Sequence, residues 1–151
     1  MSPTDSPSSA PAITLAHLSD PHISCMDTIT TRDLFSKRLF GYLRWKLVRG
    51  SGHSDRVLSV LRADLVNTKP DHIAVTGDLT HLSLSAEFKK ARQWLQTLGS
   101  PSTVTVIPGN HDAYVHTDWH KTMAHWTEYM LSDNPQDDDN DINSIDRIFP
   151  C

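Results

Sequence analysis

Cysteine is scarce in this 151-residue sequence, and long apolar runs are absent. The two cysteines, Cys25 and Cys151, are too few for the disulfide framework of a small secreted domain, so we expect a cytoplasmic protein in a reducing compartment. Nowhere do about 18 apolar residues follow one another, which argues against a membrane-spanning helix. Residues 1–12 also lack the basic and apolar segments of a signal peptide.

The sequence has no excess of basic charge. Its formal net charge is -4, so charge indicates no nucleic-acid partner. Hydrophobic residues make up 38% of the chain and include four Trp and four Phe, which is enough to fill the core of one domain. The Ser/Pro-rich residues 1–12 predict a disordered tail, and residues 13–151 predict a single domain.

Strands and helices alternate in the pattern of hydrophobic residues. Short apolar runs at residues 13–19, 72–76 and 103–107 are typical of buried strands. Two helices are predicted between these runs. The first covers residues 54–69, where Val57, Leu61 and Leu65 repeat every four positions; the second follows Ser85, with Phe88, Ala91, Leu95 and Leu98 on one face. This βαβαβ order predicts an α/β fold with a mostly parallel sheet covered by helices.

Three segments fall outside this alternation. The insertion at residues 25–53 contains six basic residues interleaved with apolar ones between residues 32 and 49, which predicts a basic amphipathic helix. Such a helix could make weak contact with a membrane surface, or its apolar stripe could pack on its own domain, which is the commoner arrangement. Trp119, Met123, Trp126 and Met130 predict one more helix, and the acidic residues 132–146 predict a solvated loop.

Polar motifs follow each of the three predicted strands. They are Asp20-Pro21-His22, Gly77-Asp78 and Gly109-Asn110-His111-Asp112. Because the carboxyl ends of parallel strands meet at one edge of the sheet, we expect their side chains to converge there. Asp, His and Asn side chains suit Mn²⁺, Fe or Zn²⁺. The alternative is three polar turns on a nucleotide-binding or regulatory α/β domain.

These motifs resemble the first three sequence blocks of the calcineurin-like metallophosphoesterase superfamily. The resemblance covers residues 13 to about 115, and the segments HLSDPHIS, DHIAVTGDLT and VTVIPGNHDAY are most similar to bacterial members that resemble class III cyclic-nucleotide phosphodiesterases. It implies the N-terminal half of a four-layer α/β/β/α sandwich. It also implies hydrolysis of a phosphomonoester or phosphodiester, with a small phosphoester or nucleotide as substrate and a hydroxide activated by a dinuclear metal centre.

The resemblance assigns a role to each residue of the motifs. Asp20 and His22 would bind the first of two divalent metal ions (Mn²⁺, Fe²⁺/Fe³⁺ or Zn²⁺), Asp78 would bridge both, and Asn110 would bind the second. His111 would be catalytic and would stabilise or protonate the leaving oxygen. Asp112 would hold the loop by hydrogen bonds. His81 stands where many phosphodiesterase-like relatives carry an acidic residue that orients the catalytic histidine.

The sequence also departs from the family pattern after the third motif. The superfamily completes its metal site with downstream histidines, one after a Gly and a pair in a Gly-His-x-His motif, and neither motif occurs downstream of Asp112 in this chain. The second metal site is therefore incomplete, and we expect the chain to be an N-terminal fragment of a longer enzyme, inactive or weakly active alone. The alternative is an inactive fragment or a binding module of the same fold. His116 and His120, four residues apart, could supply ligands, although exposed helix histidines are commoner.

Overall fold

The computed structural model describes part of the chain, at residues 12–25, 28–29, 39, 43, 53–113, 115 and 118–131. The predicted tail and the acidic loop at residues 132–146 lie outside this part, apart from residue 12. So does most of the insertion at residues 25–53, and the predictions made for these segments stay predictions. Among the described residues, no helix is both long and apolar enough to cross a bilayer.

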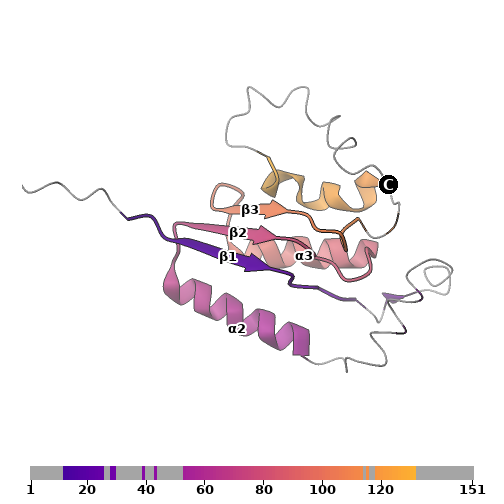
Figure 1. Ribbon diagram of the computed structural model, residues 1–151, viewed down its shortest axis with the longest axis horizontal. Coiled ribbons are helices and arrows are strands. Elements are labelled where there is room, and N and C mark those ends of the chain that lie inside the picture. Colours follow the sequence, from indigo (N-terminus) through magenta and orange to yellow (C-terminus); the bar gives the residue numbers. More distant parts are fainter. Residues whose placement is uncertain are drawn as a thin grey trace, which may run out of the picture.

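A parallel three-stranded sheet forms the centre of the fold, in the order β1-β2-β3 (Figure 1). The strands are β1 (Leu15–Ser19), β2 (His72–Thr76) and β3 (Val104–Ile107), joined through helices α2 (His53–Thr68) and α3 (Ser85–Leu98). Ser19 pairs with Thr76, and Thr76 pairs with Ile107, so the three strands end at the same edge. The predicted α/β class and the βαβαβ order are confirmed.

One face of the sheet is packed against α2 and α3. Alternate residues of each strand point to this face, as the two-residue period of a strand requires. The central side chains from β2 and β3 are fully or nearly fully buried, and they meet leucines of α2 and the apolar face predicted for α3. This core contains Leu58, Leu65, Ile73, Val75, Phe88, Ala91, Leu95, Val104 and Val106.

The buried face of α2 differs by one position from the prediction. Val57 is 59% exposed, whereas Leu58 is only 8% exposed and packs in the core beside Leu65. Both Val57 and Leu58 lie within one turn of Leu61 on a helix with 3.6 residues per turn. The four-residue spacing therefore could not distinguish between them.

Residues 119–130 form two short 3₁₀ segments in place of the predicted α-helix. These are η2 (Trp119–Lys121) and η3 (Met123–Tyr129), and the backbone at Trp126 departs from helical angles. The hydroxyl of Thr122 donates to the backbone oxygen of Asp118 at 3.0 Å. A side chain that bonds to the backbone in this way competes with the regular helix. The segment still buries Trp126, whose ring lies 5.0 Å from that of Phe88 between centroids.

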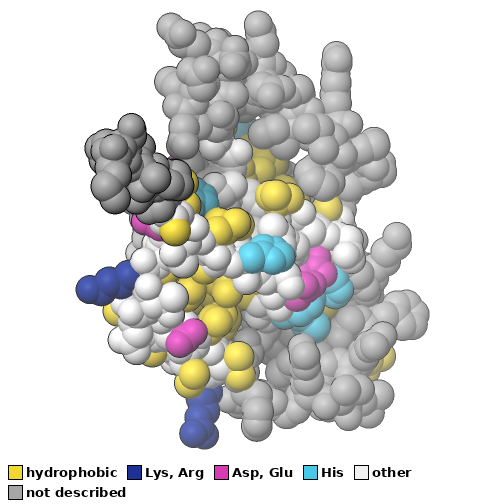
Figure 2. Space-filling view, turned by 60° about the vertical axis from the view of Figure 1, so that its left-hand side comes forward, with side chains coloured by type: hydrophobic (Ala, Val, Ile, Leu, Met, Phe, Trp, Pro, Cys, Tyr) yellow, Lys and Arg dark blue, Asp and Glu magenta, His cyan; other side chains and the backbone are white. Residues whose placement is uncertain are grey.

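The opposite face of the sheet combines apolar and polar side chains. His17 Nε2 lies 2.7 Å from the hydroxyl of Thr76, and His72 Nε2 lies 2.8 Å from that of Thr105. At the rim of this face, Leu15 is 61% exposed. Hydrophobic, histidine and acidic side chains also adjoin on the surface shown in Figure 2.

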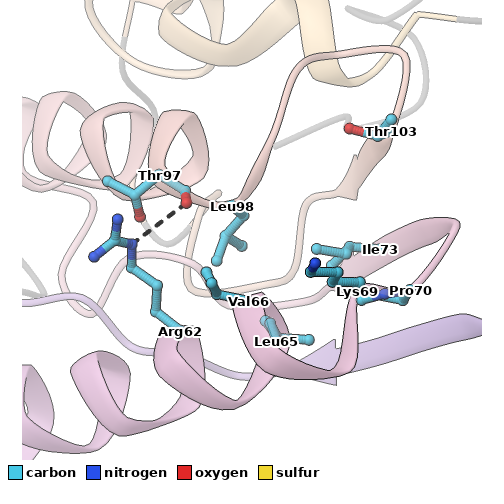
Figure 3. Close-up of a pocket in the computed structure, with 9 residues that line it drawn as sticks. All are labelled: Arg62, Leu65, Val66, Lys69, Pro70, Ile73, Thr97, Leu98 and Thr103. Carbon is cyan, nitrogen blue, oxygen red and sulfur yellow. Dashed lines mark hydrogen bonds between the residues drawn. The ribbon is translucent and has the colours of Figure 1, made fainter.

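A cavity of about 230 Å³ lies between α2, the end of α3 and the start of β2 (Figure 3). Beside it, Arg62 Nε donates to the backbone oxygen of Thr97 at 3.4 Å. Lys69 and Pro70 line it just before β2 begins. The cavity is therefore at the amino-terminal edge of the sheet, away from the polar motifs that follow the strands.

Candidate active site

The loops after β1 and β2 hold an unusual concentration of left-handed backbone. The φ angles are 54° at Asp20, 44° at His22 and 38° at Asp78, and Ser83 in the same loop as Asp78 has a φ of 53°. Residues other than glycine adopt such angles at a cost, and they persist where the surrounding structure holds them, often at functional sites. The backbone thus marks the carboxyl edge of the sheet as the candidate site.

Two carboxylates and one imidazole converge at this edge. One donor atom from each of Asp20, His22 and Asp78 lies within 4.8 Å of the others. The His22 amide donates to the backbone oxygen of Asp78 at 3.0 Å, which joins the loop after β1 to the loop after β2. Asp78 is nearly buried, whereas Asp20 is exposed. Mixed oxygen and imidazole donors of this kind suit Mn²⁺, Fe or Zn²⁺.

Asp78 also joins the loop after β2 to the loop after β3. Its Oδ1 accepts a hydrogen bond from the His111 amide at 2.8 Å. A Cβ atom added at Gly109 would collide with the amide nitrogen and Oδ1 of Asp78. Position 109 must therefore be glycine for the two loops to approach this closely.

Asp112 is a buried acceptor shared by the same two loops. Its Oδ1 accepts from the amide of Thr80 at 2.7 Å and from the Thr80 hydroxyl at 2.9 Å. Its Oδ2 accepts from the amides of Gly109 at 2.9 Å and Leu79 at 3.1 Å. Burial raises the pKa of Asp112, and these hydrogen bonds oppose the shift. The carboxylate fixes the positions of the backbone on both sides of Asp78.

The ring of His111 is oriented by the main chain. Its Nδ1 lies 2.7 Å from the backbone oxygen of His81, so Nδ1 carries the proton and donates. The backbone oxygen of His111 in turn accepts from the hydroxyl of Ser83 at 2.6 Å. The acceptor that orients the His111 ring is thus the backbone carbonyl of residue 81 and not a side chain.

Sequence reasoning missed Glu87, a carboxylate in the first turn of α3 that is fully buried. Its Oε2 accepts from the amides of Leu82 at 2.9 Å and Leu84 at 3.1 Å. Hydrogen bonds from the backbone of Cys25 and His81 also favour its charged form, while burial raises its pKa overall. Glu87 therefore supports the loops that follow His22 and Asp78. An acidic residue in the first helical turn was the only sequence signal, and it is typical of exposed caps too.

Comparison with known proteins now adds to this geometry. A family model described as calcineurin-like phosphoesterase matches residues 13–149. The chain belongs to the calcineurin-like phosphoesterase family. It is also 32% identical over 98 residues to the glycerophosphodiester phosphodiesterase GpdQ of Enterobacter lignolyticus (strain SCF1). That match covers 65% of this chain and 29% of the relative, so the chain spans less than a third of that protein's length.

The calcineurin-like phosphoesterases normally depend on a dinuclear metal centre, and the described residues fit the first of its two ions. Asp20, His22 and Asp78 supply three donors close together. The fit to the second ion depends on Asn110, which is exposed. The metal roles of all four residues stay predictions. His116 lies outside the described residues, and His120 is exposed, so their pairing is also a prediction.

Proposed function

We propose that this chain carries the metal-binding half of a phosphoesterase that hydrolyses a small phosphomonoester or phosphodiester. The observation that supports this most is the convergence of Asp20, His22 and Asp78 within 4.8 Å, with the His111 ring 5.0 Å from that of His22 between centroids. Family membership gives hydrolysis of phosphoesters as the reaction class. Because the second metal site is incomplete, weak activity of the 151-residue chain alone is part of the proposal.

Each residue has a stated task in the proposed reaction. Asp20, His22 and Asp78 would hold one divalent ion, and Asp78 with Asn110 would hold the second. When bound, the ions supply Lewis acidity that polarises phosphoryl oxygens and activates water. His111 keeps its Nδ1 proton on the carbonyl of His81, so a second proton on Nε2 is the one it would give to the leaving oxygen.

We propose small phosphodiesters as the substrate class. The matched relative is named as a glycerophosphodiester phosphodiesterase, so small phosphodiesters are the first substrates to test here. Nucleotides are a second substrate class, which the family resemblance of the motifs implies. Weak membrane-surface contact through residues 32–49 and a cytoplasmic location are predictions that do not depend on the substrate.

Hydrolysis of bis(p-nitrophenyl) phosphate and p-nitrophenyl phosphate tests the proposal. The purified chain is stripped with chelator, and Mn²⁺ is returned with and without the Asp78→Asn substitution. Asp64→Asn, on the exposed surface of α2, is the matched control. We expect weak Mn²⁺-dependent release of p-nitrophenol, which Asp64→Asn retains and Asp78→Asn abolishes. Hydrolysis indifferent to both the chelator and Asp78→Asn would refute the proposal.

A binding module without catalysis is the second candidate. The exposed side chain of Asn110 favours it, because the described residues then offer a good site for one ion only. Equilibrium dialysis with Mn²⁺ separates the two candidates. Two ions per chain support the hydrolase, whereas one ion together with no hydrolysis supports the module.

A further inference from the structure

A second group of possible metal ligands overlaps the first and consists of histidines alone. His22, His81 and His111 each place one ring nitrogen within 4.8 Å of the other two. They come from the loops after β1, β2 and β3 respectively. The His22 ring is edge-on to the other two, at 5.0 Å from His111 and 5.7 Å from His81, and the rings of His81 and His111 are stacked at 5.8 Å.

Hydrogen bonding prepares this cluster for a cation. The bond from His111 Nδ1 to the carbonyl of His81 leaves the lone pair of the neutral ring on Nε2. Histidines that bind metals almost always donate their other ring proton to a carbonyl, carboxylate or water in this manner. His22 Nδ1 is buried and has no hydrogen-bond partner among the residues that the structure describes. One of the three rings is thus locked in the form that ligates.

Ligand chemistry separates this cluster from the carboxylate group beside it. Three neutral imidazoles form a ligand set that Zn²⁺ uses with one open position. Mn²⁺ binds nitrogen ligands more weakly than Zn²⁺ does and suits carboxylates better. The only shared residue is His22, while Asp20 and Asp78 belong to the carboxylate group alone.

We propose that His22, His81 and His111 form a Zn²⁺ site that is distinct from the Asp20–His22–Asp78 group. Residue 81 makes the site possible, because its side chain provides the third imidazole. A zinc ion bound there takes the Nε2 lone pair of His111, so zinc would inhibit any hydrolysis that uses this nitrogen. That inhibition rests on the proposed function, whereas the binding itself does not.

The test measures binding directly. The metal-free chain is titrated with Co²⁺ in the absence of Mn²⁺, because Mn²⁺ bound by the carboxylate group would occupy the shared His22. The visible absorption of Co²⁺ reports tetrahedral coordination. Zn²⁺ then displaces the Co²⁺ and gives the zinc affinity. His81→Phe keeps a ring of similar shape and removes both nitrogens. His120→Phe makes the same change at an exposed histidine and is the matched control.

We expect tetrahedral Co²⁺ absorption in the wild type and in His120→Phe, and its loss in His81→Phe. The zinc affinity should fall in His81→Phe by more than about 100-fold, since losing a ligand costs more than the 10–100-fold typical of losing its hydrogen-bond partner. His111→Asn retains a donor for the carbonyl of His81 and removes Nε2, and it should lose zinc to a similar degree. Circular dichroism of each variant checks its folding.

Asp20→Asn distinguishes zinc in the histidine cluster from zinc in the carboxylate group. We expect this variant to keep the zinc affinity of the wild type within about threefold, because Asp20 is no part of the cluster. The proposal is overturned if His81→Phe folds and binds zinc like the wild type, or if Asp20→Asn or His120→Phe lowers zinc binding in its place. Zinc binding that depends on His81 without any hydrolysis would leave this proposal standing and count against the proposed function alone.

Discussion

Replacing Asp112 by asparagine tests whether this carboxylate holds the turns after β2 and β3 together. Asparagine has one oxygen for four donors. The least costly orientation keeps that oxygen toward Leu79 and Gly109 and turns the amide nitrogen toward Thr80. The Thr80 hydroxyl can then accept, or donate to the backbone oxygen of His111 at 3.3 Å. Only the backbone amide of Thr80 is left facing another donor.

The expected magnitude follows from these contacts. A buried amide that loses its acceptor costs about 1–3 kcal/mol, and the two bonds that remain lose the assistance of the negative charge. We therefore expect Asp112→Asn to lower the free energy of unfolding by about 2 kcal/mol. Asp112→Ala removes the acceptor from the amides of Leu79, Thr80 and Gly109, so it should cost at least about 3 kcal/mol.

Urea unfolding followed by tryptophan fluorescence measures both variants, since Trp126 is fully buried in the folded chain. Asp64→Asn provides the exposed control and should remain within about 0.5 kcal/mol of the wild type. If Asp112→Asn and Asp112→Ala also remain within that margin, the turns do not depend on Asp112 and the reasoning is refuted.

Two further predictions concern the loops around Asp78. Gly109→Ala forces a Cβ against Asp78 and should lower the free energy of unfolding by about 1–3 kcal/mol. The variant should also show no Mn²⁺ binding in calorimetric titrations. Gly77→Ala is the control, because a Cβ at position 77 meets no atom within 4 Å. It should lower the free energy of unfolding by about 1–2 kcal/mol, which is the cost of a positive φ for alanine. Equal loss of Mn²⁺ binding in both variants would contradict the prediction. Burial raises the pKa of Glu87 in the folded chain above its ordinary value of 4.5. Between 4.5 and the raised pKa, the folded chain therefore binds more protons than the unfolded chain, and the free energy of unfolding falls as pH rises. Glu87→Gln should make this fall shallower in urea unfolding at a series of pH values, and an unchanged slope would count against a raised pKa.

The elements that form the sheet and its helical cover were largely predictable from local pattern. Ile73 and Val75 of β2, Val104 and Val106 of β3, and the face of α3 formed by Phe88, Ala91 and Leu95 are buried as predicted. The prediction of a buried strand was wrong for β1, where Leu15 is 61% exposed, because the run of apolar residues does not show whether a strand lies at the edge of the sheet. Short-range spacing was insufficient where two faces compete, as at Val57 and Leu58. It also missed the break at Thr122 between η2 and η3, because a 3–4 spacing of large apolar residues does not reveal a threonine that bonds to the backbone.

The candidate site was predictable to the extent that parallel strands bring their ends together. That rule placed Asp20, His22 and Asp78 in one group from residues 58 positions apart in sequence. It could not reveal that His81 turns its carbonyl to His111, nor that Glu87 is buried beneath the loops. Both depend on how residues 81–84 fold over the start of α3, which no periodicity encodes.

The hydrogen bonds to Asp78 and Asp112 have a consequence for how ions enter and leave. Many small metal sites exist only while the ion is bound, so loading and folding are a single equilibrium. Here main-chain amides from two loops donate to carboxylate oxygens of the protein, so the proposed ligands are held in place by the fold itself. On the proposed metal roles, exchange of one cation for another would require no unfolding of the chain, and the supply of metals would decide which ion is bound.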